Sequence, residues 1–185
     1  KMRTFAIRMI NVPSLIQLKA FARIDGLWLA LLWTASFMSM MYMPKSALGG
    51  LLMLATPPFM LWRLIKFRNY ALDGVISFAR GLAYGCYCIF YASLLFALVQ
   101  TAYFQFLDGG HFVQIMHQAL QTMEGVYQQN GVDIKQAMET VDLMGTLKPI
   151  ELAFVFMTQN LLLGALLSVI VAAIGMKRVK NHTRI

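Results

Sequence analysis

Few side chains in this sequence have the types and the spacing that catalysis or metal binding requires. Asp108 and Glu151 fall at the predicted outer ends of two apolar segments, where their carboxylates could meet as an acid/base pair. His111 and His117 are six residues apart, whereas a spacing of four places two metal ligands on one face of a helix. None of the eight acidic residues is expected at the centre of a membrane span. We therefore predict that the protein is not an enzyme and holds neither a metal ion nor a cofactor.

The two cysteines indicate packing rather than chemistry. Cys86 and Cys88 lie two residues apart in one apolar run, so on a helix their side chains point to different sides. This geometry disfavours a disulfide between them, and no other soft ligand lies nearby to complete a metal site. We interpret both as small apolar residues of a membrane helix.

The strongest polar signal is the amide pair Gln159 and Asn160, which lies inside a long apolar run. Lipid cannot solvate an amide, whereas a neighbouring helix can hydrogen-bond it, with a gain of about 0.6–2 kcal/mol. The small residues Gly164 and Ser168 follow on nearby turns and permit close helix approach. We predict that these residues pack against other helices, within the bundle or on a partner. The alternative is that the amides line a polar pathway or contact a lipid headgroup.

The composition requires that a bilayer surround the elements that carry these residues. Of 185 residues, 59% are hydrophobic and 13% charged, and the mean hydropathy is +0.62. Soluble domains have about 45–50% apolar and about 25% charged residues. The net charge of +8 would suggest nucleic acid in a soluble chain, but here the basic residues flank apolar runs. We read them as a topology signal and predict no nucleic-acid partner.

The apolar runs predict an all-α membrane protein with four transmembrane helices. The first three lie within 24–107 and the fourth is 149–176; their individual ranges are 24–43, 48–67, 75–107 and 149–176. Thr56-Pro57-Pro58 is expected to kink the second span or split it. Gly81 and Gly85 in the third span form a small-xxx-small pair for helix packing.

Residues 1–23 are predicted to form a basic amphipathic arm on the cytoplasmic leaflet, or alternatively a flexible basic tail. Pro13 is expected to interrupt any helix in this arm, and Asp25 to cap the first span. Residues 177–185 read as a basic cytoplasmic tail.

Residues 108–148 are the only sizeable polar segment, and their spacing predicts an extracytoplasmic amphipathic helical hairpin. Its apolar face includes Met116, Leu120, Met123 and Val126. This face could pack on the bundle, lie on the membrane or hold a partner protein.

The distribution of Lys and Arg predicts that both termini are cytoplasmic and that the hairpin is outside. The basic residues expected to contact anionic lipid headgroups on the cytoplasmic side are Arg63, Lys66, Arg68, Arg80, Lys177 and Arg178.

Two motifs carry a family resemblance. Ile76-Ser77-Phe78 enters the third span, and Pro149-x-Glu151 precedes Gln159-Asn160 in the fourth. With the sequence around them, over residues 48–178, they resemble the DUF4199 family of small membrane proteins found in Bacteroidota. The resemblance implies four spans, a bacterial inner-membrane location and an association with genes for polyprenyl-phosphate glycosyltransferases.

These observations lead to two functional expectations. The first is a non-enzymatic accessory subunit of the inner membrane that assembles with or stabilises a larger complex through helix–helix contacts and its periplasmic hairpin. The alternative is a carrier or flippase-like partner of a polyprenyl-phosphate glycosyltransferase that handles lipid-linked sugar. The alternative predicts that Arg80, Gln159 and Asn160 converge on one cavity.

Overall fold

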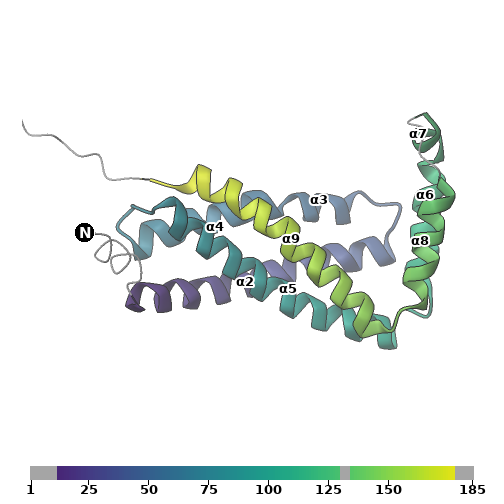
Figure 1. Cartoon of the computed structure of the whole chain (residues 1–185), viewed down its shortest axis with the longest axis horizontal. Coiled ribbons are helices and arrows are strands. Elements are labelled where there is room, and N and C mark those ends of the chain that lie inside the picture. Colours follow the sequence, from purple (N-terminus) through teal and green to yellow (C-terminus); the bar gives the residue numbers. More distant parts are fainter. Residues whose placement is uncertain (1–11, 130–133, 178–185) are drawn as a thin grey trace, which may run out of the picture.

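A computed structural model describes residues 12–129 and 134–177, which form helices and connecting turns without a β-strand. The helices are α2 (Val12–Tyr42), α3 (Leu48–Leu54), α4 (Thr56–Ala71), α5 (Phe78–Phe106), α6 (His111–Thr122), α7 (Glu124–Gln129), α8 (Ile134–Thr146) and α9 (Pro149–Gly175). Helices α2, α5, α9 and the α3–α4 pair run side by side, and the α6–α8 hairpin lies across one end of them (Figure 1).

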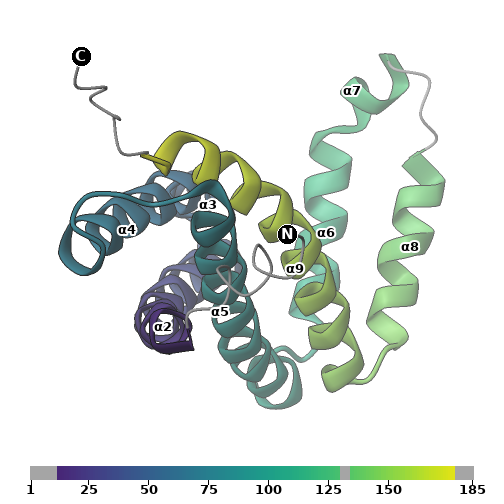
Figure 2. The same ribbon diagram turned by 60° about the vertical axis from the view of Figure 1, so that its left-hand side comes forward.

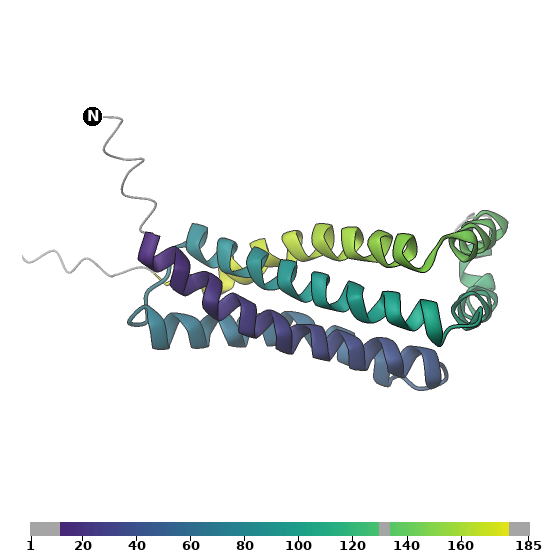
Figure 3. The same ribbon diagram turned by 90° about the horizontal axis from the view of Figure 1, so that it is seen from below.

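Four segments are long and apolar enough to cross a membrane, as the sequence predicted. They begin at Leu15, Leu48, Phe78 and Pro149 and have 28, 24, 29 and 27 residues, with α3 and α4 together making the second. A helix of 24 residues is about 36 Å long, which exceeds the hydrocarbon thickness of about 30 Å. Seen from below, the four segments keep a common direction, and the hairpin closes the end opposite the beginning of α2 and the end of α9 (Figure 3).

The first helix begins earlier than expected. It starts at Val12 rather than at residue 24, so residues 12–23 belong to the spanning helix and not to a separate arm. Pro13 does not interrupt it, because a proline in the first turn lacks only an N–H that has no partner there anyway. The prediction that Asp25 caps this helix is therefore wrong, since Asp25 lies 13 residues after Val12. Residues 1–11 lie outside the described part of the chain.

The split of the second span is confirmed. Helix α3 ends at Leu54 and α4 begins at Thr56, with the two prolines in the first turn of α4. Two buried hydrogen bonds hold the break against α2. The indole Nε1 of Trp33 donates to Thr56 Oγ1 at 3.0 Å, and Ser36 Oγ donates to the carbonyl of Gly49 at 2.7 Å.

Helix α5 packs between α2 and α9, and small residues set the α5–α9 distance. A Cβ added at Gly85 would lie 2.7 Å from Ser168 Oγ, and one at Gly81 would lie 3.4 Å from Ala172 Cβ. Gly164 faces Ile89 with no room for a Cβ. The glycines and the serine chosen from the sequence thus lie in this one interface.

The motif Ile76-Ser77-Phe78 joins the beginning of α5 to the end of α9. Ser77 is the N-cap of α5, and its side chain accepts a hydrogen bond from the backbone N–H of Arg80 at 3.4 Å. The backbone of Ile76 pairs with that of Lys177 through two hydrogen bonds of 3.0 and 3.1 Å. Ile76 is also 1% exposed, so it anchors the loop before α5 in the core.

The base of the hairpin packs on the bundle, which is one of the three placements that the sequence left open. Helices α6 and α8 run side by side (Figure 2), and His117 Nε2 lies 2.9 Å from Asp142 Oδ1 between them. Phe112 is buried, with its ring centroid 5.6 Å from that of Phe104 and 5.7 Å from that of Phe156. The residues of the predicted apolar face differ in exposure. Met116 and Leu120 are half-buried, Met123 is exposed, and the side chain of Val126 lies outside the described part.

Candidate functional site

The most unusual polar group in the bundle is the Asp25 carboxylate, which is 1% exposed. One of its oxygens accepts a hydrogen bond from Nη2 of Arg63, with which it forms an ion pair. The other accepts a hydrogen bond from the Tyr84 hydroxyl. Helices α2, α4 and α5 each contribute one residue, so this cluster links three of the four spans.

The cluster lies inside the membrane-spanning part of the helices. Asp25 is 10 residues, or about 15 Å, from Leu15, where the apolar span of α2 begins. An ionisable residue at such depth is costly unless it is paired, and it often marks a functional site. No acid was expected at the centre of a span, whereas the structure buries Asp25 10 residues inside the first one. Arg63, which was expected among lipid headgroups, has a side chain that is 16% exposed and pairs with Asp25, so it is also tied to the interior of the bundle.

Sequence reasoning missed Asp25 and Tyr84 because it placed the start of the first span too late. With the helix extended back to Pro13, Asp25 becomes an acid in the interior of an apolar helix. Such an acid requires a cationic partner, and Arg63 in the next span is a candidate. Tyr84 carried no comparable signal, since tyrosines are common in membrane helices.

A small pocket lies beside the cluster, between α2 and the last turns of α4. Its volume is about 220 Å³, and it is lined by Phe21, Asp25, Arg63, Lys66, Phe67 and Tyr70. The aromatic wall is continuous with the core, since Phe67 stacks on Tyr84 with ring centroids 5.0 Å apart. Lys66 is exposed, and its Nζ lies 5.6 Å from the ring of Trp62 and 5.9 Å from that of Tyr70.

The other basic residues predicted to contact headgroups lie in different surroundings. Arg68 Nη1 donates to the carbonyl of Gly175 at 3.0 Å, which ties α4 to α9. Arg80 is in the first turn of α5, and Lys177 takes part in the backbone pair with Ile76. Arg178 lies outside the described residues.

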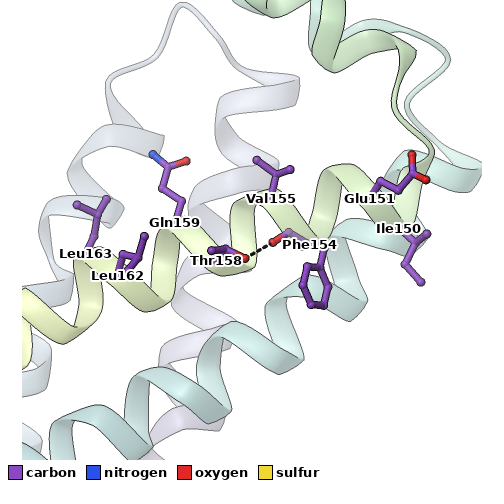
Figure 4. A pocket seen from close by; sticks show the side chains of 8 residues that line it. All are labelled: Ile150, Glu151, Phe154, Val155, Thr158, Gln159, Leu162 and Leu163. Atoms are coloured by element: carbon purple, nitrogen blue, oxygen red, sulfur yellow. Dashed lines mark hydrogen bonds between the residues drawn. The ribbon is translucent and has the colours of Figure 1, made fainter.

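The outer face of α9 forms a second candidate site, a shallow groove of about 770 Å³. It is lined by Ile150, Glu151, Phe154, Val155, Thr158, Gln159, Leu162 and Leu163 (Figure 4). Gln159 is exposed here, and its amide has no hydrogen-bond partner within the described part of the chain. Thr158 satisfies its own hydroxyl by donating to the Phe154 carbonyl at 2.9 Å.

The two amides of the fourth span face different surroundings, because adjacent helical residues point about 100° apart. Gln159 is exposed in the groove, whereas Asn160 is half-buried and does not line it. Arg80 does not line it either. Its neighbour Gly81 faces Ala172, which is 13 residues, or about 20 Å, along α9 from Gln159. The predicted convergence of Arg80, Gln159 and Asn160 on one cavity is therefore wrong.

The acids considered for catalysis serve as helix caps. The carboxylate of Asp108 accepts from the backbone N–H groups of Phe112 at 2.9 Å and Gly110 at 3.1 Å. Glu151 accepts from the backbone N–H of Lys148 at 2.9 Å. In residues 12–129 and 134–177, no three His, Cys, Asp or Glu side chains are grouped so that they could hold a metal ion.

Comparison with known proteins gives one match. A family model described as "Protein of unknown function (DUF4199)" matches residues 24–177. The matched segment contains both candidate sites, the buried charged cluster and the outer face of α9. No curated protein and no solved structure matches the chain.

Proposed function

This chain belongs to the DUF4199 family, as its sequence predicted, and from that premise we propose that it is a non-enzymatic accessory subunit of a larger membrane complex. In this proposal the outer face of α9 is the surface on which a spanning helix of another subunit packs. The membrane is the bacterial inner membrane, with both termini cytoplasmic and the hairpin outside.

The exposure of Gln159 carries this proposal. Its amide lies 10 residues, or about 15 Å, from Pro149 at the start of α9, on the surface that faces away from the bundle. Lipid at this depth offers neither a donor nor an acceptor. A partner helix that brings an amide or a hydroxyl to this position would satisfy the amide, with a gain of about 0.6–2 kcal/mol.

The occupant that fits this face is a helix of a different protein. The groove is mainly apolar, so it suits a spanning segment with one polar side chain opposite Gln159. A second copy packed in parallel would bring two basic chain ends together, each from a chain with a net charge of +8. A different subunit avoids that repulsion.

The exposed side of the hairpin offers a second contact for such a partner. Met123 in the turn after α6 is 48% exposed, and Leu143 on α8 is 67% exposed. The hairpin that carries both residues extends across one end of the bundle (Figure 1). The proposal places a soluble or juxtamembrane part of the partner there.

Photo-cross-linking in native membranes tests the proposal. A photo-reactive residue replaces Leu162, which is 66% exposed in the groove. We expect one adduct with a different membrane protein, formed through a spanning segment that carries a polar side chain. Gln159→Leu in the same chain should lower the adduct yield about 3- to 30-fold, since it removes one intramembrane hydrogen bond.

Two controls make the result specific. The photo-reactive residue at Leu98, which is 64% exposed on α5, should not give this adduct. Asn160→Leu makes the same amide-to-leucine change outside the groove and should leave the yield within about twofold. An adduct with the mass of two copies, or equal losses in the two leucine variants, would contradict the proposal.

A further inference from the structure

The pocket beside the Asp25–Arg63 pair has the chemistry of an anion site that opens at the membrane interface. Arg63, Lys66 and Tyr70 recur at spacings of three and four residues along α4, so they share one face. Phe21 and Asp25, four residues apart on α2, form the opposite wall. Two cations and one carboxylate line the pocket, which leaves one positive charge in excess.

Each of the two cations keeps hydrogen-bonding capacity that the described residues do not satisfy. Arg63 donates to Asp25 through Nη2, but its buried Nε–H has no acceptor among the described residues. Lys66 contacts only the faces of Trp62 and Tyr70, and it forms no ion pair in the part of the chain that the structure describes. The exposed ammonium of Lys66 is therefore the group that an anion in this pocket would meet first, with Arg63 in the pocket wall beside it.

The surroundings identify the kind of anion. Tyr70 is 79% exposed and lies one residue before the end of α4, as is typical of aromatic residues at the level of lipid headgroups. The volume of about 220 Å³ is below the about 300–1,000 Å³ of pockets that enclose drug-sized ligands. The pocket therefore has room for one phosphate group, while attached acyl chains would lie along the apolar surface outside it.

We infer that this pocket binds the phosphate of an anionic membrane phospholipid, held by Lys66 and Arg63. Asp25 sets the selectivity, because both of its oxygens already accept hydrogen bonds and it is 1% exposed. It cannot pair with the amine of a zwitterionic headgroup, so the site favours lipids whose only headgroup charge is the phosphate. This inference uses a different face of the bundle from the α9 groove and does not depend on the proposed partner.

The test compares two lysines on the full-length protein in nanodiscs. Binding of a fluorescent phosphatidylglycerol is measured for the natural protein and for Lys66→Gln. We expect about fivefold weaker binding in the variant, the loss of one basic residue next to an anionic lipid. Lys66→Arg keeps the charge and should bind within about twofold of the natural protein.

Lys19→Gln is the matched control. Lys19 also lies over an aromatic ring, with its Nζ 5.2 Å from the centre of Tyr87, but it does not line the pocket. We expect it to leave lipid binding within about twofold. Equal losses of lipid binding in the two glutamine variants would show that the lipid is attracted by basic residues in general and not by this pocket. That result would overturn the inference.

Two competitors identify the source of the phosphate. Unlabelled phosphatidylglycerol vesicles should displace the fluorescent lipid, and phosphatidylcholine vesicles should not. Inorganic phosphate at millimolar concentration should also fail to displace it, because it lacks the acyl chains that hold the lipid at this depth. Displacement by phosphatidylcholine would refute the selectivity, and displacement by inorganic phosphate would assign the pocket to a soluble anion instead.

Discussion

At the residue scale, the ion pair between Asp25 and Arg63 constrains how α2 and α4 can pack. The two partners are not equivalent, since the side chain of Asp25 is 2% exposed and that of Arg63 is 16% exposed. A guanidinium that loses its partner can still reach water through its exposed part. A carboxylate at the position of Asp25 cannot, so the cost of breaking the pair depends on which residue is removed.

We therefore expect Arg63→Met to destabilise the protein more than Asp25→Asn does. The first leaves a buried charge without its cation, which costs about 3–5 kcal/mol, whereas asparagine is neutral and can still accept from the Tyr84 hydroxyl. The double variant should be more stable than the sum of the two single changes predicts. The protein is titrated with sodium dodecyl sulfate in a mild detergent, and unfolding is followed by tryptophan fluorescence, to which the buried Trp33 contributes.

Arg23→Met provides the control for this series. Arg23 is exposed on the same helix as Asp25 and has no ion pair in the described structure. The same substitution there should change the free energy of unfolding by no more than about 0.5 kcal/mol. If Arg63→Met were as mild as Arg23→Met, the pair would not hold α2 to α4.

At the scale of the elements, the contact between α5 and α9 depends on the absence of a side chain at Gly85. A Cβ there would lie 2.8 Å from the Cβ of Ser168, closer than packed carbon atoms allow. We expect Gly85→Ala to destabilise the protein by about 1–3 kcal/mol, as overpacking of a tight interface does. The same detergent titration measures it.

Two further variants show whether packing is the cause. Gly50→Ala adds a methyl group to α3 where no atom lies within 4 Å, so it should be neutral or stabilise by up to about 1 kcal/mol through helix propensity. Ser168→Gly, combined with Gly85→Ala, removes the two atoms nearest the new methyl group and should restore part of the lost stability. Equal destabilisation by Gly85→Ala and Gly50→Ala would mean that close approach does not matter at this interface.

The elements were predictable from the sequence to the extent that apolar length and proline define them. Four apolar runs were enough to predict four spans, and Pro57-Pro58 was enough to predict the break between α3 and α4. The start of α2 was predicted 12 residues too late, because Pro13 reads equally well as an interruption or as a first-turn residue. That one boundary decides whether Asp25 caps a helix or lies buried inside one.

The candidate site was less predictable because it depends on how the helices are arranged around α5. Hydropathy shows that a helix spans the membrane but not which face meets which neighbour. The pairing of Asp25 with Arg63 and Tyr84 requires α2, α4 and α5 to meet at one level. For the same reason the sequence could identify Gln159 as an intramembrane amide without showing that it faces outwards.

At the scale of the whole molecule, the fold separates two ends of opposite character. Helix α2 begins and α9 ends at the same end of the bundle, and the hairpin closes the other (Figure 3). Of the ten lysines and arginines among the described residues, three belong to the hairpin end: Lys45, Lys135 and Lys148. The excess of basic residues marks the cytoplasmic side of bacterial membrane proteins, so we expect the hairpin to face outwards.

Single-cysteine labelling in intact bacterial cells tests this orientation. A cysteine at Gln121, exposed on α6, should react with a membrane-impermeant maleimide before lysis, whereas one at Asn69, exposed at the other end of the bundle, should react only afterwards. The natural protein supplies the background, because Cys86 and Cys88 lie within the spanning part of α5. The reverse pattern would place the hairpin inside and move the proposed partner contact on it to the cytoplasm. Labelling at both positions in intact cells would mean that the chain inserts in two orientations, so the basic excess would be too weak to fix one.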